Sequence, residues 1–348
     1  MEQVNLNNLP LEEIESLILS LGKERYRARQ IMKCLYHQGA TSFDQMTTLA
    51  RDFRIKLAEI ARIGQPELVK AQTSRDGTKK VLFRLEDGCC IESVLIPGKK
   101  HWTACLSTQV GCRMGCRFCL TGSQGFTRNL QPAEITGQLT RLKFQTPEGP
   151  EINNIVLMGM GEPLDNYENV LKAIAIITCD SGPGFSNRKL TLSTCGLAPM
   201  IGQLGRDISL NLAVSLNAAD DKTRSALMPI NKKYPLAALL AACRDYPMPG
   251  RRMLTFEYIL IAGVNDSPED AEKLARLLNG IHCKLNLIAF NEFPATAFRT
   301  PKMENIRNFQ QALLNHHYTV ILRASKGSDI LAACGQLSGQ ANELVTAT

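Results

Sequence analysis

The chain has 348 residues, of which 44% are hydrophobic and 21% charged, and its formal net charge is +7 at pH 7. This composition excludes a disordered chain and allows one large domain with a smaller one beside it. The moderate positive charge suits a polyanionic partner such as nucleic acid, although many soluble enzymes without such a partner carry a similar charge.

The N-terminal stretch Met1-Glu-Gln-Val has no basic and apolar signal segment, and no apolar run is long enough to cross a bilayer. We therefore expect a cytoplasmic protein without membrane contact. Thiols stay reduced in that compartment, so the 12 cysteines do not predict a disulfide scaffold.

Residues 1–65 predict a small helical domain, because Leu11, Ile14, Ile18 and Leu21 recur at helical spacing. Residues 66–100 predict a linker and a β-hairpin. Its two strands would be Val81–Leu85 and Cys90–Ile96, joined by an Asp-Gly turn.

Residues 101–348 predict a parallel α/β domain, because strand patterns alternate with helix patterns. The predicted strands are 102–108, 154–158, 189–194, 208–215, 253–260, 283–289 and 319–323. Pro132 opens one of the intervening helices, and Ser267 caps another. Six unbroken β/α repeats predict a partial or closed barrel.

The most unusual stretch is Cys112-Arg-Met-Gly-Cys116-Arg-Phe-Cys119, with three cysteines at C-x3-C-x2-C spacing. Three thiolates so close together are typical ligands of a metal or an iron–sulfur cluster. In a four-iron cluster they would leave one iron open to a substrate or cofactor. A zinc site completed by Cys105 or His101 is the alternative at this point.

Other polar and glycine-rich residues follow the predicted strands at the carboxyl edge, where parallel α/β proteins carry their active sites. Each alone is explained by a turn, a helix cap or a buried small side chain. Their convergence on one edge, together with the cysteine loop, predicts a catalytic site. The segments are 112–119, 159–163, 193–196, 215–217, Asn291 and 326–335.

Four longer strings in this sequence resemble one known family. They are Ser107-Thr-Gln-Val-Gly-Cys112, Gly125-Phe-Thr-Arg-Asn-Leu130, Met158-Gly-Met-Gly-Glu-Pro-Leu164 and Ala333-Cys-Gly-Gln-Leu337. The cysteine spacing with Gly-Glu-Pro after the second strand is similar to that of radical S-adenosylmethionine (SAM) enzymes. The four strings together resemble the RlmN/Cfr family of radical SAM rRNA adenosine methyltransferases, and within it the RlmN branch.

The resemblance implies a partial (β/α)6 radical SAM barrel with a helical RNA-binding accessory domain over residues 1–65. It also implies a catalytic loop near the C-terminus. Cys112, Cys116 and Cys119 would ligate one [4Fe–4S] cluster, and two SAM molecules would be used per turnover. The residues that match SAM-contacting positions are Gly161, Glu162, Ser193, Ser215, Leu216, Asn217 and Asn291.

The implied reaction adds a methyl-derived carbon to C2 of adenosine, a position that is not nucleophilic and therefore needs radical chemistry. Cys334 matches the cysteine that is first methylated. Cys105 matches the resolving thiol, which forms a transient disulfide with Cys334, and Glu92 matches the proton acceptor. The implied substrates are 23S rRNA and possibly tRNA. We also expect a reductase or flavodoxin-type electron donor and a monomeric enzyme.

Two departures from the family pattern are visible. Asn217 stands where RlmN proteins usually have His, and Asn291-Glu-Phe-Pro replaces an Asn-Pro sequence. Pro163 favours RlmN over Cfr, which methylates C8 of the same adenosine and has Ala there. C8 methylation and a non-catalytic, zinc-stabilised RNA-binding protein remain the alternatives. A predicted phosphate-contacting patch comprises Arg25, Arg27, Arg29, Lys79, Lys80, Lys99 and Lys100.

Overall fold

The protein is described by a computed structural model that covers residues 3–99, 101–146, 151–248, 250, 252–294 and 296–340. Its centre is a ten-stranded sheet in the order β14-β13-β12-β11-β10-β9-β6-β5-β4-β3. Strands from β6 to β14 in this order are mutually parallel. They are β6 (Trp102–Cys105), β9 (Ile152–Leu157), β10 (Leu190–Thr194), β11 (Asn211–Ser215), β12 (Leu254–Leu260), β13 (Cys283–Ala289) and β14 (Thr319–Arg323).

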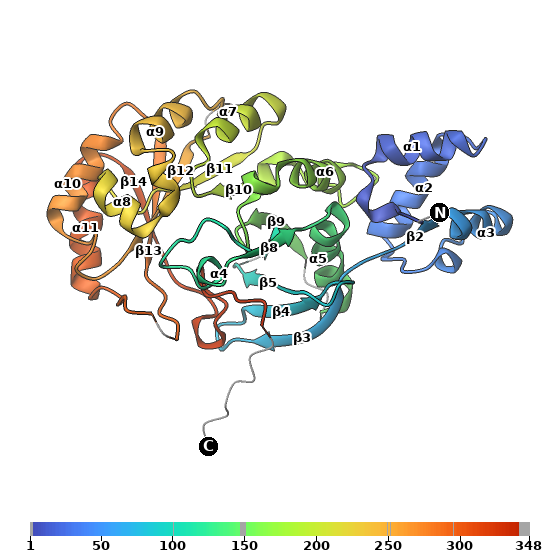
Figure 1. Ribbon diagram of the computed structural model, residues 1–348, viewed down its shortest axis with the longest axis horizontal. Helices are drawn as coiled ribbons and strands as arrows, with labels where there is room; N and C mark the ends of the chain where they lie inside the picture. The colour runs from blue at the N-terminus through green and yellow to red at the C-terminus, as the bar shows by residue number, and fades with distance from the viewer. Residues whose placement is uncertain are drawn as a thin grey trace, which may run out of the picture.

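The predicted α/β barrel is confirmed as a partial one, with helices outside a curved sheet whose two ends are β14 and β3 (Figure 1). The outer helices are α5 (Pro132–Gln145), α6 (Tyr167–Thr178), α7 (Ala198–Asp207), α8 (Asp221–Leu227), α9 (Leu236–Arg244), α10 (Pro268–Leu277) and α11 (Met303–Asn315). Pro132 begins α5 as predicted, and Ser267 caps α10 by accepting from the amide of Asp270.

The predicted hairpin is β4 (Lys79–Arg84) and β5 (Cys90–Pro97), which pair antiparallel, and β5 joins the barrel through β6. A further strand, β3 (Glu67–Thr73), pairs with β4 at the edge of the sheet and was missed by the sequence analysis. The side chains of β3 are exposed or half-buried, so it lacks the apolar alternation by which strands are recognised.

The N-terminal helices are α1 (Leu11–Ser20), α2 (Tyr26–Tyr36) and α3 (Arg51–Ile60), and they lie beside α5 and α6 at one end of the molecule (Figure 1). They share an apolar core that includes Ile14, Ile31 and Leu57. The short strands β1 (Val4–Asn5) and β2 (Ala61–Arg62) pair and close this unit. Ile176 of α6 packs into the same core, which connects it to the barrel.

Two short strands and a short helix surround the three-cysteine stretch. β7 (Gln109–Gly111) precedes the stretch and pairs with β8 (Phe126–Asn129), and α4 (Leu120–Ser123) follows it. The 3-10 turns are η1 (Leu6–Asn8), η2 (Phe43–Gln45), η3 (Pro163–Asn166), η4 (Asn187–Lys189), η5 (Pro229–Lys232) and η6 (Ser328–Ile330). In the described part of the chain, no helix has the length and apolar character needed to span a membrane.

Candidate active site

The three-cysteine loop is held in place by its backbone. The amide of Cys112 donates to the carbonyl of Gly125 at 2.7 Å, and the amide of Cys119 donates to the carbonyl of Cys116 at 3.1 Å. Gly111 has φ +73°, and a Cβ there would lie 2.1 Å from the carbonyl oxygen of Gly125. Only glycine allows the two backbone segments to approach this closely.

The loop packs in an apolar cluster with Leu227, Met228 and Phe290. Burial and neighbouring thiols raise the pKa of Cys112 to about 12 and raise the pKa of Cys116 well above its ordinary value. All three are free thiols. As arranged, no group of three His, Cys, Asp or Glu side chains within the described residues forms a ready-made metal site.

The donor set nevertheless fits an iron–sulfur cluster. Three thiols that line one cavity and electrostatically affect one another are soft ligands, and a bound metal favours their deprotonated form. The structure therefore brings the three predicted ligands to one place, and the cluster would have to draw their sulfur atoms together.

The segment after β9 needs its glycines because it packs against the segment after β6. A Cβ on Gly159 would meet Ser107 Oγ at 2.6 Å, and one on Gly161 would meet Gln109 Cβ at 2.5 Å. The side chain of Glu162 is buried, and its two carboxylate oxygens accept from the amides of Leu164 at 3.0 Å and Cys195 at 2.7 Å. Burial raises its pKa, against the effect of these hydrogen bonds.

One cavity brings the three cysteines together with four predicted SAM contacts, Gly161, Glu162, Ser193 and Ser215. These residues come from the carboxyl ends of β9, β10 and β11, as the barrel architecture requires. Leu216 and Asn217 are fully buried, and within the described chain they are not among the residues that line this cavity.

Asn217 has a structural position. Its side-chain oxygen accepts from the amide of Ile259 at 2.8 Å, and its carbonyl accepts from Asn265 Nδ2 at 2.8 Å. It also adopts a left-handed backbone with φ +59°, a conformation that asparagine tolerates better than most residues. Its contacts connect the segment after β11, two residues beyond Ser215, to β12 and to the loop that follows β12.

A second cavity lies beside the first and is lined by Cys105, Asn291, Arg323 and Lys326. The two cavities share part of their walls, formed by Cys119, Met158, Gly159, Ile288, Cys334 and Gly335. The Cys334 side chain is solvent-accessible there, and both Cys334 and Cys105 are free thiols. Burial raises the pKa of both thiols. Cys334 further raises the pKa of Cys105, and the Glu257 carboxylate raises the pKa of each, which places the two thiols close together.

The loop that carries Cys334 is attached to the barrel around it. Asn291 Nδ2 donates to the carbonyl of Cys334 at 3.1 Å, and Thr121 Oγ1 donates to the carbonyl of Leu337 at 2.6 Å. Asn291 therefore orients the Cys334 backbone and lines the second cavity, while the four contacts named above line the first.

Glu92 lies on β5 and contacts the end of the loop that carries Cys334. Its carboxylate pairs with Lys80 at 2.9 Å and accepts from the amides of Ser338 at 2.7 Å and Gly339 at 3.1 Å. Within the described chain, Glu92 is not among the residues that line the two cavities.

Lys80, a member of the predicted phosphate-contacting patch, is buried in its pair with Glu92, so its assignment to that patch was wrong. Lys100 of the same patch lies outside the described residues.

Three residues at the site were missed by the sequence analysis. Glu257 lines the first cavity, and Arg323, 3.4 Å from it, lines the second. The signal for Glu257 was a single carboxylate inside the apolar strand Leu254–Leu260. The third residue, Arg224, is fully buried. Its guanidinium donates to Asn231 Oδ1 and to the carbonyls of Cys195, Ser215 and Leu216. Arg224 therefore joins the ends of β10 and β11.

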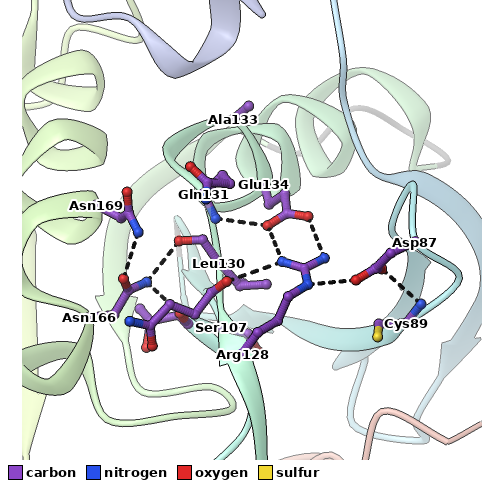
Figure 2. A network of polar contacts seen from close by, with 12 residues as sticks. Asp87, Cys89, Ser107, Arg128, Leu130, Gln131, Ala133, Glu134, Asn166 and Asn169 are labelled. Atoms are coloured by element: carbon purple, nitrogen blue, oxygen red, sulfur yellow. Dashed lines mark hydrogen bonds and ion pairs between the residues drawn. The ribbon is translucent and has the colours of Figure 1, made fainter.

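The segment Gly125–Leu130 stabilises the position of the cysteine loop through β8, which pairs with β7. Arg128 of β8 lies between two carboxylates (Figure 2), at 2.6 Å from Asp87 in the hairpin turn and 2.8 Å from Glu134 at the start of α5. The two partners hold the pKa of Arg128 above its ordinary value. Asn166 Nδ2 donates to the carbonyl of Leu130 at 2.8 Å. Because β8 pairs with β7, this network positions the strand from which the cysteines follow.

Comparisons with known proteins agree with this geometry. The profile of the ribosomal RNA large subunit methyltransferase N-terminal domain matches residues 4–63, and that of the radical SAM superfamily matches residues 106–278. The chain is similar to the dual-specificity RNA methyltransferase RlmN of Syntrophus aciditrophicus, with 68% identity over 99% of both chains. It is 52% identical to RlmN of Geobacter sulfurreducens, over 98% of this chain and 94% of the relative.

The crystal structure of a radical SAM methyltransferase from Sphaerobacter thermophilus matches with a TM-score of 0.92 and 44% identity, over 97% of this chain and 100% of that one. Radical SAM membership implies a [4Fe–4S] cluster and SAM as cofactors. The chain therefore belongs to the RlmN family of radical SAM RNA methyltransferases.

Proposed function

We propose that this enzyme adds a SAM-derived carbon to C2 of an adenosine in 23S rRNA, with Cys334 as the carrier of that carbon. The observation that supports this most strongly is the position of Cys334 on the wall shared by the two cavities. A thiol there lies between the cavity that contains the cysteine loop and the cavity in which we propose that the RNA base binds.

In the first cavity, Cys112, Cys116 and Cys119 would hold the cluster, while Gly161, Glu162, Ser193 and Ser215 would bind SAM. When bound, these cofactors supply the carbon-radical chemistry that an unreactive adenine carbon requires. The buried Glu162 carboxylate is suited to an amine, because a cation beside it offsets the cost of its burial. The apolar walls exclude water from the reacting groups.

In the second cavity, the Cys105 thiolate would release the product by attacking the sulfur of Cys334. The S–S bond of a transient disulfide forms as the bond between that sulfur and the transferred carbon breaks, and the carbon keeps the electron pair and takes up a proton. Burial raises the pKa of Cys105, while the cationic Arg323 lowers it, so Arg323 favours the thiolate that this attack needs. Glu92 is the proposed proton acceptor, a role that the resemblance implies.

The RNA side of the proposal rests on the family. Several relatives are named dual-specificity RNA methyltransferases, which supports tRNA as a second substrate class. We propose that residues 1–65 form the RNA-binding accessory domain, 66–100 the linker and hairpin, and 101–348 the catalytic barrel. The base would have to leave its stack to reach Cys334. A flavodoxin-type donor and a monomeric state remain predictions.

The deciding experiment is mass spectrometry of adenosine from RNA treated anaerobically with the reconstituted enzyme, SAM and a reductant. We expect 2-methyladenosine; 8-methyladenosine would assign the Cfr-type activity instead. Stoichiometric zinc without iron, and no cleavage of SAM, would support the non-catalytic alternative.

The role of Cys334 has a separate test. Cys334→Ala should abolish methylation of RNA, and persistent methylation would exclude a carrier thiol. Cys283→Ala is the matched control, because Cys283 is a buried cysteine at the opposite end of the parallel strands, where β13 begins.

A further inference from the structure

The segment that carries Cys334 is held at both ends by one buried ion pair. At its start, Lys80 Nζ donates to the carbonyl of Leu331 at 3.4 Å. At its end, Glu92 Oε2 accepts from the amides of Ser338 and Gly339. Glu92 Oε1 pairs with Lys80 at 2.9 Å, so the two contacts form one unit.

Lys80 and Glu92 belong to the two strands of the antiparallel hairpin. In the register of β4 and β5, Lys80 pairs with Val94 and Leu82 pairs with Glu92, which places the two charged residues diagonally on one face. Their side chains are only 10% and 3% exposed. A buried ion pair contributes little net stability compared with apolar residues, and one use of such pairs in proteins is to select a single conformation.

The segment that it holds has an unfavourable backbone. Leu331 adopts a left-handed conformation with φ +54°, which is rare for a residue with a bulky side chain. Such conformations persist where surrounding contacts impose them, and Lys80 donates to the carbonyl of Leu331 itself.

We propose that the Lys80–Glu92 pair is a clamp that fixes the Cys334 loop between the two cavities, with Lys80 as a positioning residue. The clamp bears on activity only through the proposed role of Cys334, and to that extent it rests on the proposed function. It assigns the hairpin a task, which is to orient the carrier cysteine from outside the barrel. It also explains why Glu92 has both of its oxygens engaged below the loop.

Hydrogen–deuterium exchange of the full-length protein tests the clamp without requiring turnover. In Lys80→Met, exchange in peptides spanning residues 331–339 should rise about ten-fold, because the clamp loses its cation and Leu331 loses its donor. Lys80→Arg keeps the charge and should restore most of the protection. The control is Lys273→Met, which removes an exposed lysine 3.8 Å from Asp270 on α10 and should leave this exchange unchanged.

Two further measurements separate positioning from general destabilisation. Thermal unfolding identifies a variant that is globally unfolded, and Lys80→Gln then serves as the milder replacement. In a folded variant, the rate of RNA methylation should fall about ten-fold while RNA affinity stays within about two-fold, as expected when a positioning contact is lost.

Unchanged exchange over 331–339 in both folded Lys80→Met and Lys80→Gln would overturn the clamp. If exchange rises but the wild-type enzyme never methylates RNA, the clamp stands and the proposed function fails. If exchange rises and methylation by the variants is as fast as wild type, the loop is clamped but its orientation does not limit catalysis, which overturns the positioning role of Lys80.

Discussion

The amide of Leu120 donates a hydrogen bond of 2.7 Å to the carbonyl of Gly335. Leu120 directly follows Cys119, and Gly335 directly follows Cys334. The proposed radical-generating loop and the proposed carrier loop, more than half the chain apart in sequence, are therefore joined by their backbones. A substitution that displaces the backbone of one loop should therefore displace the other.

Gly111→Ala should prevent assembly of the cysteine loop. The new Cβ would collide with the carbonyl of Gly125, which already accepts from the amide of Cys112. We expect iron incorporation to fall well below that of wild type, measured by iron analysis after anaerobic reconstitution. Gly184→Ala is the control, because Gly184 has φ +74° with nothing within 4 Å of its Cβ position. Equal iron content in the two variants would contradict this prediction.

Glu162→Gln should weaken both the fold and SAM binding. Each carboxylate oxygen accepts a hydrogen bond from a backbone amide. The NH2 group of glutamine would replace one of these acceptors, so one backbone amide would lose its hydrogen bond. We expect a loss of about 1–3 kcal/mol in the free energy of unfolding. Calorimetric titration with SAM should show weaker binding. Glu168→Gln on the exposed side of α6 is the control, and equal effects would argue against this role.

Arg224→Met should destabilise the edge of the barrel where SAM is proposed to bind. It would leave the carbonyls of Cys195, Ser215 and Leu216 without this donor in a buried setting. We expect a loss of about 3 kcal/mol or more, measured by urea unfolding. Lys222→Met on the same helix removes an exposed cation, and a similar loss there would mean that burial of Arg224 is not the cause.

The cluster-free protein should lose stability in alkaline solution. The pKa of Cys112 is about 12 in the fold against an ordinary value of 9.0, so the folded state keeps its proton where the unfolded state has lost it. The contribution of the Cys112 thiol to the free energy of unfolding is therefore fully present below pH 9 and is lost as the pH rises from 9 toward 12. Between pH 9 and 10 one such thiol should cost about 1 kcal/mol.

This prediction is measured by urea unfolding of the reduced, metal-free protein at pH 9 and pH 10. Other groups also titrate in this range, so the informative quantity is the difference between wild type and Cys112→Ser. Wild type should lose more stability than the variant over this interval. An equal loss would show that Cys112 ionises alike in the folded and unfolded states.

Several features could be predicted from local patterns because they depend on neighbours in sequence. Pro132 and Ser267 mark helix starts, and the hairpin follows from its Asp-Gly turn. Strand β3 could not be recognised, because an edge strand with exposed side chains carries no apolar alternation. Glu257 and Arg323 were passed over because each is an ordinary strand residue until its neighbours across the sheet are known.

The sequence by itself determined the order of the hairpin and barrel strands, the cysteine spacing and the family, because these depend on residue identity and separation along the chain. Only the tertiary structure decided that Cys334 lies between two cavities, that Asn217 is engaged in strand contacts, and that Lys80 is buried against Glu92. Such facts depend on which residues meet after distant segments pack together. The contact between Lys80 and Leu331 could not be predicted from the residues around Lys80, because Leu331 lies on a loop near the other end of the chain.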